Sequence, residues 1–342
     1  MALGSALTTA YLLSWPVPIE PESWTPPHAS PHVANASLAN VELLQPSLPS
    51  PEAITFDDQG RIVTGLLDGR VIRFTPEGND LTVLAQTGGR PLGLKYDGMG
   101  RLIVADAHRG LLAIGPQGDI ENLVAEYGGK ALRLVDDLDV AKDNTVYFSD
   151  ATARWPLEQY KMDIIEHRPS GRLFAYRPDR RVELVLGELY FANGVALSPD
   201  ESYVLVAETM SYRIRRVYLR GPKAGQNDVF VDNLPGFPDN ITWSPARHAF
   251  WIALATPREP AIDVLGPWPS VRKALARLPE FLQPKIRRHA RALAVDETGR
   301  VLVDLQHDSP TSYSPLTSVI ERDAFLYLGS FVHSGVGRIS AP

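Results

Sequence analysis

The sequence lacks cysteine altogether among its 342 residues. This absence excludes disulfides, thiolate catalysis, iron–sulfur clusters and cysteine-ligated zinc sites. It leaves the compartment open, because cysteine-free proteins occur in both reducing and oxidising surroundings.

The beginning of the chain lacks positive charge and a long hydrophobic run, since the first lysine or arginine is Arg61. A secretory signal needs a basic start, and a membrane-spanning helix needs about 20 apolar residues. The mildly apolar stretch MALGSALTTAYLLSWPVPIEP supplies neither. We interpret it either as the remnant of a membrane anchor whose earlier residues are missing or as a loosely packed tail. The localisation therefore stays unknown: soluble as given, and periplasmic or membrane-anchored as the alternatives for a longer form.

Positive charge and familiar catalytic motifs are also scarce. The net charge is −6 and the pI is near 5.8, and no basic run suggests nucleic-acid binding. The sequence has no G-x-S-x-G, P-loop, H-E-x-x-H or G-x-G-x-x-G motif, which argues against serine hydrolases and nucleotide enzymes. We expect a small-molecule substrate, no nucleic-acid partner, and membrane association only through residues missing before the N-terminus.

What the sequence does contain is a repeat. Apolar residues, a turn rich in Asp and Gly, and a second apolar strand recur along the chain, as in AITFDDQGRIVTGL and LGLKYDGMGRLIVAD. Five equivalent turn positions from residue 57 to residue 244 are separated by 40, 44, 57 and 46 residues. Steps of this size match four-stranded blades arranged radially. The fold class predicted is all-β, a β-propeller.

The blade count follows from the ends of the chain. The last blade has three C-terminal strands, and the segment 40–45 (NVELLQ) supplies the fourth, which ties the termini together. The prediction is a six-bladed propeller over residues 40–342, preceded by a tail and Pro-rich linker over residues 1–39. Two helical or loop insertions, ATARWPLEQYKMDIIEHRPSG in blade three and PREPAIDVLGPWPSVRKALARLPEFLQP in blade five, are expected over one face, with outside packing as the alternative. The second contains a predicted helix with Ser270 as N-cap.

Polar side chains recur where each blade begins. The first strand of a propeller blade lines the central channel, so the residues just before those strands converge on the axis. Four of the six positions carry a carboxylate or carboxamide, and none carries Lys or Arg. In blade order the six residues are Glu52, Leu92, Asp136, Asn193, Asp239 (followed by Asn240) and Thr317.

Converging carboxylates predict a cation. Buried carboxylates that face one another are costly unless a positive charge compensates them. Oxygen ligands alone suit a hard cation such as Ca²⁺, and Mg²⁺, Mn²⁺ or Zn²⁺ remain as substitutes. The sequence therefore predicts a metal in the central tunnel, held by Glu52, Asp136, Asn193, Asp239 and Asn240.

Several motifs together resemble a known superfamily. DDLDVAKDNTVYFSDAT, FANGVALSPDESYVLVAET, RIRRVYLRGPKAG and NLPGFPDNI are similar to the gluconolactonase, regucalcin, paraoxonase and strictosidine synthase-like proteins. The branch they resemble most includes adipocyte plasma membrane-associated protein. The resemblance implies a six-bladed propeller with Ca²⁺ in its tunnel, and the five residues just named match the family's metal ligands. The blade-three ligand is usually Asn in the family, whereas this chain has Asp136.

Two departures from the family narrow the predicted activity. Thr317 occupies the position at which strictosidine synthase has its catalytic Glu, so amine–aldehyde condensation of that type is disfavoured. Leu92 occupies the position at which the paraoxonases have a His that assists catalysis, and His108 is nearby in the sequence.

The leading functional prediction is metal-assisted hydrolysis of a lactone or of an aryl or alkyl ester. Its catalytic residues would be Asp239, as base or nucleophile, with Asn193 and Asp136. The alternatives are a non-enzymatic, metal-braced propeller that binds a small molecule or partner, and a strictosidine synthase-type lyase. Tentative pocket residues are Leu92, His108, Trp155, Tyr160, Phe191, Trp243 and Thr317.

Overall fold

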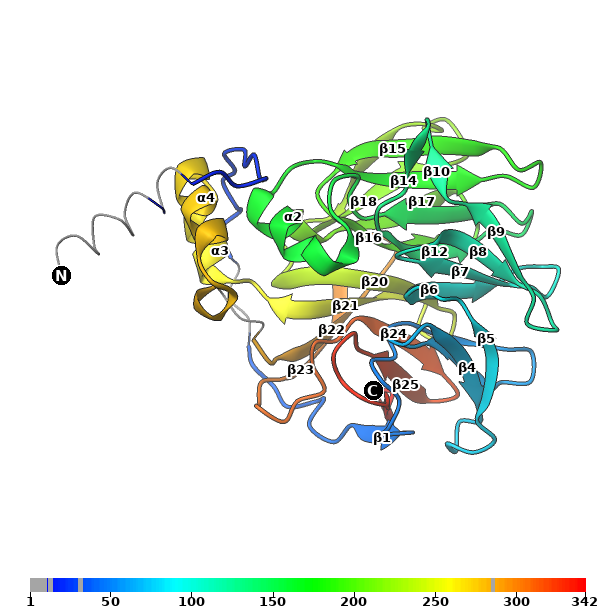
Figure 1. Cartoon of the computed structure of the whole chain (residues 1–342). Helices are drawn as coiled ribbons and strands as arrows, with labels where there is room; N and C mark the ends of the chain where they lie inside the picture. The colour runs from blue at the N-terminus through cyan, green and yellow to red at the C-terminus, as the bar shows by residue number, and fades with distance from the viewer. Residues whose placement is uncertain (1–10, 12–14, 30–32, 284–286) are drawn as a thin grey trace.

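Six four-stranded antiparallel sheets stand around a central axis (Figure 1), which confirms the predicted six-bladed propeller. The computed structural model describes residue 11 and residues 15–29, 33–283 and 287–342. The first strand of each blade is innermost: β2, β6, β12, β16, β20 and β24 contact one another in that order, and β24 returns to β2. These strands bring the six blade entrances to the axis.

The blades have the following strands, from the axis outward. Blade one has β2 (Ile54–Phe56), β3 (Ile62–Gly65), β4 (Arg70–Phe74) and β5 (Thr82–Gln86). Blade two has β6 (Pro91–Tyr96), β7 (Leu102–Asp106), β8 (Gly110–Ile114) and β9 (Ile120–Val124). Blade three has β12 (Val135–Val140), β13 (Val146–Asp150), β14 (Gly171–Tyr176) and β15 (Val182–Leu189), and a small hairpin, β10 (Glu126–Tyr127) and β11 (Lys130–Ala131), precedes it.

The remaining blades follow the same plan. Blade four has β16 (Ala192–Leu197), β17 (Tyr203–Glu208), β18 (Arg213–Tyr218) and β19 (Asn227–Val231), with a short 3₁₀ turn, η2 (Thr209–Ser211). Blade five has β20 (Gly236–Ser244), β21 (Ala249–Pro257), β22 (Ala290–Val295) and β23 (Val301–His307). Blade six has β24 (Ser318–Arg322), β25 (Phe325–Gly329), β26 (Val336–Ser340) and, outermost, β1 (Glu42–Leu44).

The Asp/Gly turns of the repeat have a shared structural basis. In D-x-x-G-R, the Asp57 carboxylate accepts hydrogen bonds from the backbone N–H groups of Gln59 and Arg61, at 3.0 and 2.8 Å. The Arg61 Nε donates to the same carboxylate at 2.7 Å. The same pattern recurs at Asp97 and Asp296. Asp supplies the local hydrogen bonds and Gly the positive φ that such turns require.

Ring closure joins the two ends of the chain. β1 pairs antiparallel with β26, with Leu44 opposite Val336 and Glu42 opposite Arg338, and the latter two also form an ion pair at 2.8 Å. Leu44 and Val336 are buried in one cluster with Tyr327. The predicted origin of the outermost strand of blade six is therefore confirmed.

Both insertions lie at the same end of the propeller (Figure 1). The first, between β13 and β14, contains η1 (Leu157–Gln159) and α2 (Tyr160–Glu166); the second, between β21 and β22, contains α3 (Pro260–Leu265), α4 (Pro269–Arg277) and η3 (Glu280–Leu282). The prediction of Ser270 as N-cap is wrong: Trp268 caps α4 and makes no side-chain hydrogen bond, and Pro269 occupies the first position of the helix. Proline suits that position because its missing N–H would be unpaired there anyway.

Residues 15–29, which we call the N-terminal strap, pack against both insertions. Ile19 is buried with Trp155 and Ile165. The backbone N–H of Glu20 donates to Glu166 of α2 at 2.7 Å, and that of Trp24 donates to the carbonyl of Gly266, between α3 and α4, at 3.0 Å. The strap has no regular secondary structure, as its prolines predict, and Ile19 is its one buried residue. The rest of the suggested anchor remnant, residues 1–10 and 12–14, lies outside the described residues.

Arg272 of α4 joins the strap to the first insertion. Its buried guanidinium donates to the carbonyls of Ile165 and Glu166 at 3.1 Å and to the carbonyl of Glu22. Within the described part of the chain, no helix is long and apolar enough to cross a membrane.

Candidate metal centre

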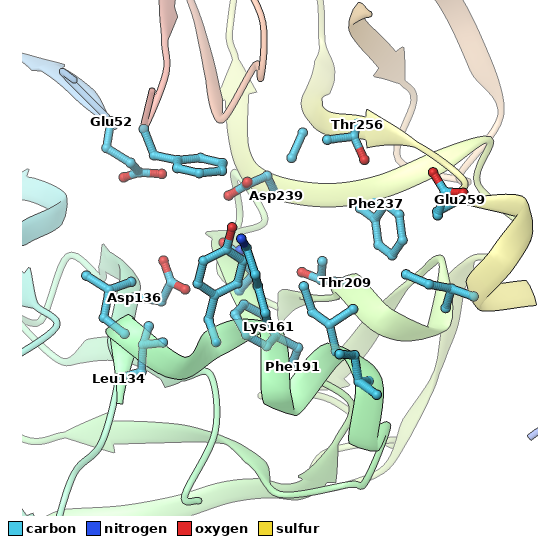
Figure 2. A pocket seen from close by; sticks show the side chains of 18 of the residues that line it. Glu52, Leu134, Asp136, Lys161, Phe191, Thr209, Phe237, Asp239, Thr256 and Glu259 are labelled. Carbon is cyan, nitrogen blue, oxygen red and sulfur yellow. The ribbon is translucent and has the colours of Figure 1, made fainter. Parts of the chain in front are cut away.

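A cavity of about 350 Å³ opens between the axis and the insertions (Figure 2). Its inner end is polar and is lined by Glu52, Asp136, Asn193 and Asp239 from four different blades. Figure 2 shows the carboxylates of Glu52, Asp136 and Asp239 pointing toward one shared space. The predicted convergence of these residues is therefore present in the fold.

β-Bulges aim these side chains at the axis. The innermost strand shifts register between Val135 and Leu138, between Ala192 and Val195, and between Pro238 and Ile241. Each shift spans a predicted ligand position, and an equivalent shift follows Pro91 in blade two. A bulge places an extra residue on one strand and turns its side chain out of the regular alternation. Adjacent polar residues such as Asp239 and Asn240 can thus both face buried surroundings.

Glycine permits the inner strands to approach closely. A Cβ on Gly194 would lie 2.3 Å from the Asp239 carbonyl oxygen, and one on Gly93 would lie 2.5 Å from an Asp137 carboxylate oxygen. Real Cβ atoms do not approach other atoms so closely, so only glycine fits. Gly93 and Gly194 occupy the bulge position that holds Asn240 in blade five, and this tight spacing holds the ligand positions at the axis.

Buried oxygens without hydrogen-bond partners mark the centre. The side chains of Glu52, Asn193 and Asn240 are each at most 5% exposed. Each has an oxygen, Oε2 or Oδ1, with no hydrogen-bond partner, although Asn240 Nδ2 donates to the other Glu52 carboxylate oxygen at 3.3 Å. Orphaned buried oxygens are costly, and a bound cation is one way to satisfy them.

The carboxylates of the centre raise one another's pKa. Burial raises the pKa of Glu52 to about 7 and raises that of Asp136 and of Asp239 well above the usual range, and their mutual repulsion adds to the effect. Asp137 is buried beside them and its pKa rises to about 8, although its carboxylate accepts the Val195 N–H at 2.8 Å. A divalent cation at this point would favour the ionised carboxylates and counteract the shift.

Arg90 is a cavity-lining residue that the alignment of blade entrances did not predict. It precedes the blade-two entrance by two residues, lines the same cavity and is 3% exposed. Its Nη2 donates to the Ser50 carbonyl at 2.9 Å, while Nη1 has no hydrogen-bond partner. Burial lowers the pKa of Arg90, and the charges of Glu52 and Asp136 oppose that effect. The only sequence signal was its place in the turn TGGRPLG, just outside the aligned position.

The donor set fits a hard cation only if the amide oxygens take part. Across the ranges that the structure describes, no group of three or more His, Cys, Asp or Glu side chains is arranged to hold a metal by itself. Glu52, Asp136 and Asp239 therefore need Asn193 and Asn240 to complete a ligand shell. All five offer oxygen, the donor type that Ca²⁺ prefers, and three of their oxygens lack partners.

Three of the tentative pocket residues line the cavity: Leu92, Tyr160 and Phe191. Phe191 has φ 59°, an uncommon value for a large side chain, directly before the strand that carries Asn193. Strained backbone of this kind persists only where the surrounding structure imposes it.

The other four tentative pocket residues are not among the residues that line this cavity. Trp155 is buried beneath α2 and donates to Glu166 at 2.7 Å, and Trp243 packs against Phe250. His108 is paired with Glu158 at 2.7 Å on the surface. Thr317 is buried with its hydroxyl donating to the Glu52 carbonyl at 2.8 Å. Sequence proximity to a blade entrance did not reveal these orientations.

The outer walls of the cavity are apolar and come mainly from the insertions and loops. Alignment of blade entrances could not find them, because insertions lie outside the repeat. Besides Leu157, Tyr160 and Ile164 near α2, the walls include Phe237, Ile262, Leu275 and Phe331.

Comparisons with known proteins give two family matches. The strictosidine synthase family matches residues 136–222, and the strictosidine synthase-like N-terminal family matches residues 30–74. The Arabidopsis thaliana protein strictosidine synthase-like 6 is 36% identical over 300 residues, which cover 85% of this chain and 79% of that protein. The adipocyte plasma membrane-associated protein of Rattus norvegicus is 33% identical over 354 residues, covering 94% and 93%.

Solved structures similar to this chain are propellers of low sequence identity. A Xanthomonas campestris gluconolactonase has a TM-score of 0.63 at 19% identity, covering 95% of this chain and 98% of the other. An Agrobacterium tumefaciens regucalcin, described as a calcium-binding protein, has a TM-score of 0.62 at 13% identity, covering 88% and 93%. At these identities the likeness establishes the fold alone.

Proposed function

Because the chain belongs to the strictosidine synthase-like family, we propose that it is a calcium-dependent hydrolase of lactones or of aryl or alkyl esters. One observation carries the proposal: carboxylates and carboxamides from four blades converge, with unpartnered oxygens, at the inner end of a largely apolar cavity. Such a site can hold an apolar substrate and present its polar reacting group to the inner end. The gluconolactonase and regucalcin neighbours are consistent with this reading.

Glu52, Asp136, Asn193, Asp239 and Asn240 would hold the calcium. When bound, calcium supplies Lewis-acid polarisation of a carbonyl group and stabilises negative charge on its oxygen.

The chain's own residues would supply the proton transfer and the substrate binding. Asp239 would act as the general base that takes a proton from water, or as the nucleophile, because its carboxylate points into the space that the other ligands share (Figure 2). The apolar walls would hold the hydrocarbon part of the substrate and exclude water. Arg90 would partly offset the negative charge of the centre.

The first test compares Asp239→Asn with the wild type on phenyl acetate and a lactone panel. We expect a loss of roughly 10²-fold or more in kcat, because Asn cannot take up the proton. Asp58→Asn, in an exposed turn, is the control and should keep full activity. Equal rates for a folded, calcium-loaded Asp239→Asn protein would contradict the assignment.

A metal-braced, non-enzymatic propeller is the second candidate, and the buried cation Arg90 favours the structural, non-catalytic part of it. Positive charge beside Glu52 and Asp136 is a purely structural way to tolerate buried carboxylates. Removal of calcium by a chelator distinguishes the two proposals. If the protein is a hydrolase, chelation should abolish hydrolysis. If the protein is a non-enzymatic propeller, chelation should lower only its melting temperature. A condensing lyase is disfavoured, because the Thr317 hydroxyl donates to the Glu52 carbonyl and offers no acid or base.

A further inference from the structure

Three buried carboxylates lie one strand outward from the candidate metal centre, at equivalent places in blades two, three and four. Asp106, Asp150 and Glu208 are the last residues of β7, β13 and β17, the second strands of these blades. All three side chains are 0% exposed, and none of them is among the residues that line the cavity. Each is paired in the ladder with the first residue of the innermost strand of its blade.

The Asp150 carboxylate holds the chain just ahead of Asp136. Its Oδ1 accepts hydrogen bonds from the backbone N–H groups of Arg133 and Leu134, at 3.1 and 3.0 Å. The Leu134 carbonyl in turn accepts a hydrogen bond from the backbone N–H of Ala151 at 2.7 Å. The backbone is thus fixed at both its N–H and its carbonyl two residues before the predicted ligand, which limits the directions that the ligand side chain can take.

Glu208 makes the corresponding contacts ahead of Asn193. Its Oε1 accepts the backbone N–H of Tyr190 at 3.1 Å, and the N–H of Thr209 donates to the Phe191 carbonyl at 3.1 Å. Glu is one methylene longer than Asp, and its carboxylate reaches one residue farther back along the chain. The φ of 59° at Phe191 persists only where neighbouring contacts impose it, and these two hydrogen bonds flank that residue.

Blade two has the same contact without a ligand ahead of it. Asp106 Oδ1 accepts the backbone N–H groups of Arg90, His108 and Arg109, each at 3.0 Å. Two residues after Arg90 the chain has Leu92, whose side chain offers no oxygen to a cation. This blade therefore supplies an internal comparison for the other two.

In blades three and four, the second oxygen of each carboxylate binds an arginine of the third strand. Arg172 at the start of β14 donates to Asp150 Oδ2 from Nε at 3.2 Å, and Arg213 at the start of β18 donates to Glu208 Oε2. These ion pairs offset the cost of burying the two charges. Because one oxygen binds the backbone and the other binds the arginine, positioning and charge compensation can be tested separately.

We propose that Asp150 and Glu208 are positioning residues that set the affinity of the centre for its cation, because they fix the backbone ahead of Asp136 and Asn193. Hydrogen-bond partners one shell outside the ligands typically change metal affinity by about 10–100-fold when they are removed. The inference rests on the proposed metal centre, and it does not require that the protein hydrolyses an ester.

The test is a calorimetric calcium titration of the full chain, comparing the wild type with Asp150→Ala and Glu208→Ala. Both variants should bind calcium about tenfold or more weakly, because the backbone ahead of a ligand loses its restraint. Asp150→Asn keeps an oxygen that can accept the two backbone N–H groups, and its affinity should stay within about threefold of the wild type. If Asp150→Ala does not fold, Asp150→Ser replaces it, since the serine hydroxyl is one bond shorter and does not reach these N–H groups.

Two controls disturb equivalent buried contacts without releasing a ligand. Asp106→Ala removes the contact of blade two, and Arg172→Gln removes the charge partner of Asp150 but leaves its Oδ1 in place. Both should lower the melting temperature of the metal-free protein, and both should weaken calcium binding by less than about threefold.

The inference is overturned if Asp150→Ala and Glu208→Ala bind calcium as tightly as the wild type, or lose no more affinity than the two controls. It also falls, together with the metal centre, if the wild type binds no calcium. A wild type that binds calcium but hydrolyses no ester or lactone refutes only the proposed activity, and a tenfold loss in the two variants would still support the positioning role.

Discussion

At the scale of single residues, the buried carboxylate of Asp163 on α2 sets a pH dependence of stability. The side chain is 1% exposed, and burial raises its pKa to about 7. In the unfolded chain the pKa is about 3.9, so the folded state holds this proton more tightly. The contribution of this group is therefore fully present below about pH 4 and is lost as the pH rises toward 7.

Asp163→Asn should remove this loss. We expect the variant to be more stable than the wild type at pH 8, by on the order of 4 kcal/mol, and to show little difference near pH 4. Urea unfolding at the two pH values measures the effect, with the exposed Asp58→Asn as control. A gain of the same size at both pH values would mean that the substitution acts through packing rather than through ionisation.

The sequence predicted the oxygen ligands of the centre but not Arg90. Glu52, Asp136, Asn193 and Asp239 were predictable because the repeat places them at equivalent positions and all have oxygen ligands. Arg90 lies two residues outside that position and reaches the cavity only through the conformation of its turn. The orientation of Thr317, whose hydroxyl turns to the Glu52 carbonyl, depends in the same way on contacts between blades that no single repeat encodes.

At the scale of elements, the bulges of the innermost strands make the site. Gly194→Ala would place a Cβ 2.3 Å from the Asp239 carbonyl oxygen. The nearest atoms that this Cβ would meet all belong to the backbone of β20. The clash can therefore be relieved only if a strand moves, which we expect to lower the free energy of unfolding by about 1–3 kcal/mol. The displacement should also lower hydrolysis, since Asp239 moves with its strand.

Gly187→Ala on β15 is the matched control. Its new Cβ would meet only the flexible Leu184 side chain, at 3.7 Å. The free energy of unfolding should therefore change by about 0.5 kcal/mol or less. Equal destabilisation of the two variants, measured by chemical denaturation, would show that close strand packing at the axis is not the cause.

Strands were predictable from the sequence and the caps of the insertion helices were not. The alternation of apolar residues and the D-x-x-G-R turns recur, so each hairpin supports the same prediction several times. The helix α4 occurs once, and its start is fixed by Pro269 after Trp268 rather than by the serine that usually caps helices. The insertions also supply about half of the apolar cavity wall, and the repeat could not predict that half.

At the scale of the whole molecule, closure of the ring by β1 makes the first residues of the propeller essential to its last blade. Leu44→Ala should cost about 2–5 kcal/mol, because Leu44 is buried against Val336 and Tyr327. The neighbouring Leu43→Ala, on the 39% exposed side of the same strand, should cost little. Denaturant midpoints and the rate of limited proteolysis measure both; similar losses for the two variants would argue against a closing role for β1.

That closure also has a consequence for synthesis on the ribosome. Leu44 finds its partner Val336 only after nearly the whole chain has been made, which at about 5–20 residues per second takes roughly 15–60 seconds. During this interval the earlier blades can form in order, but β1 has no partner and blade one presents its flank to the cytosol, translocon or chaperones. The nascent chain is therefore exposed to misassociation until its final strand emerges, and the rate of completing the ring, more than the rate of forming any blade, should govern the yield of native protein.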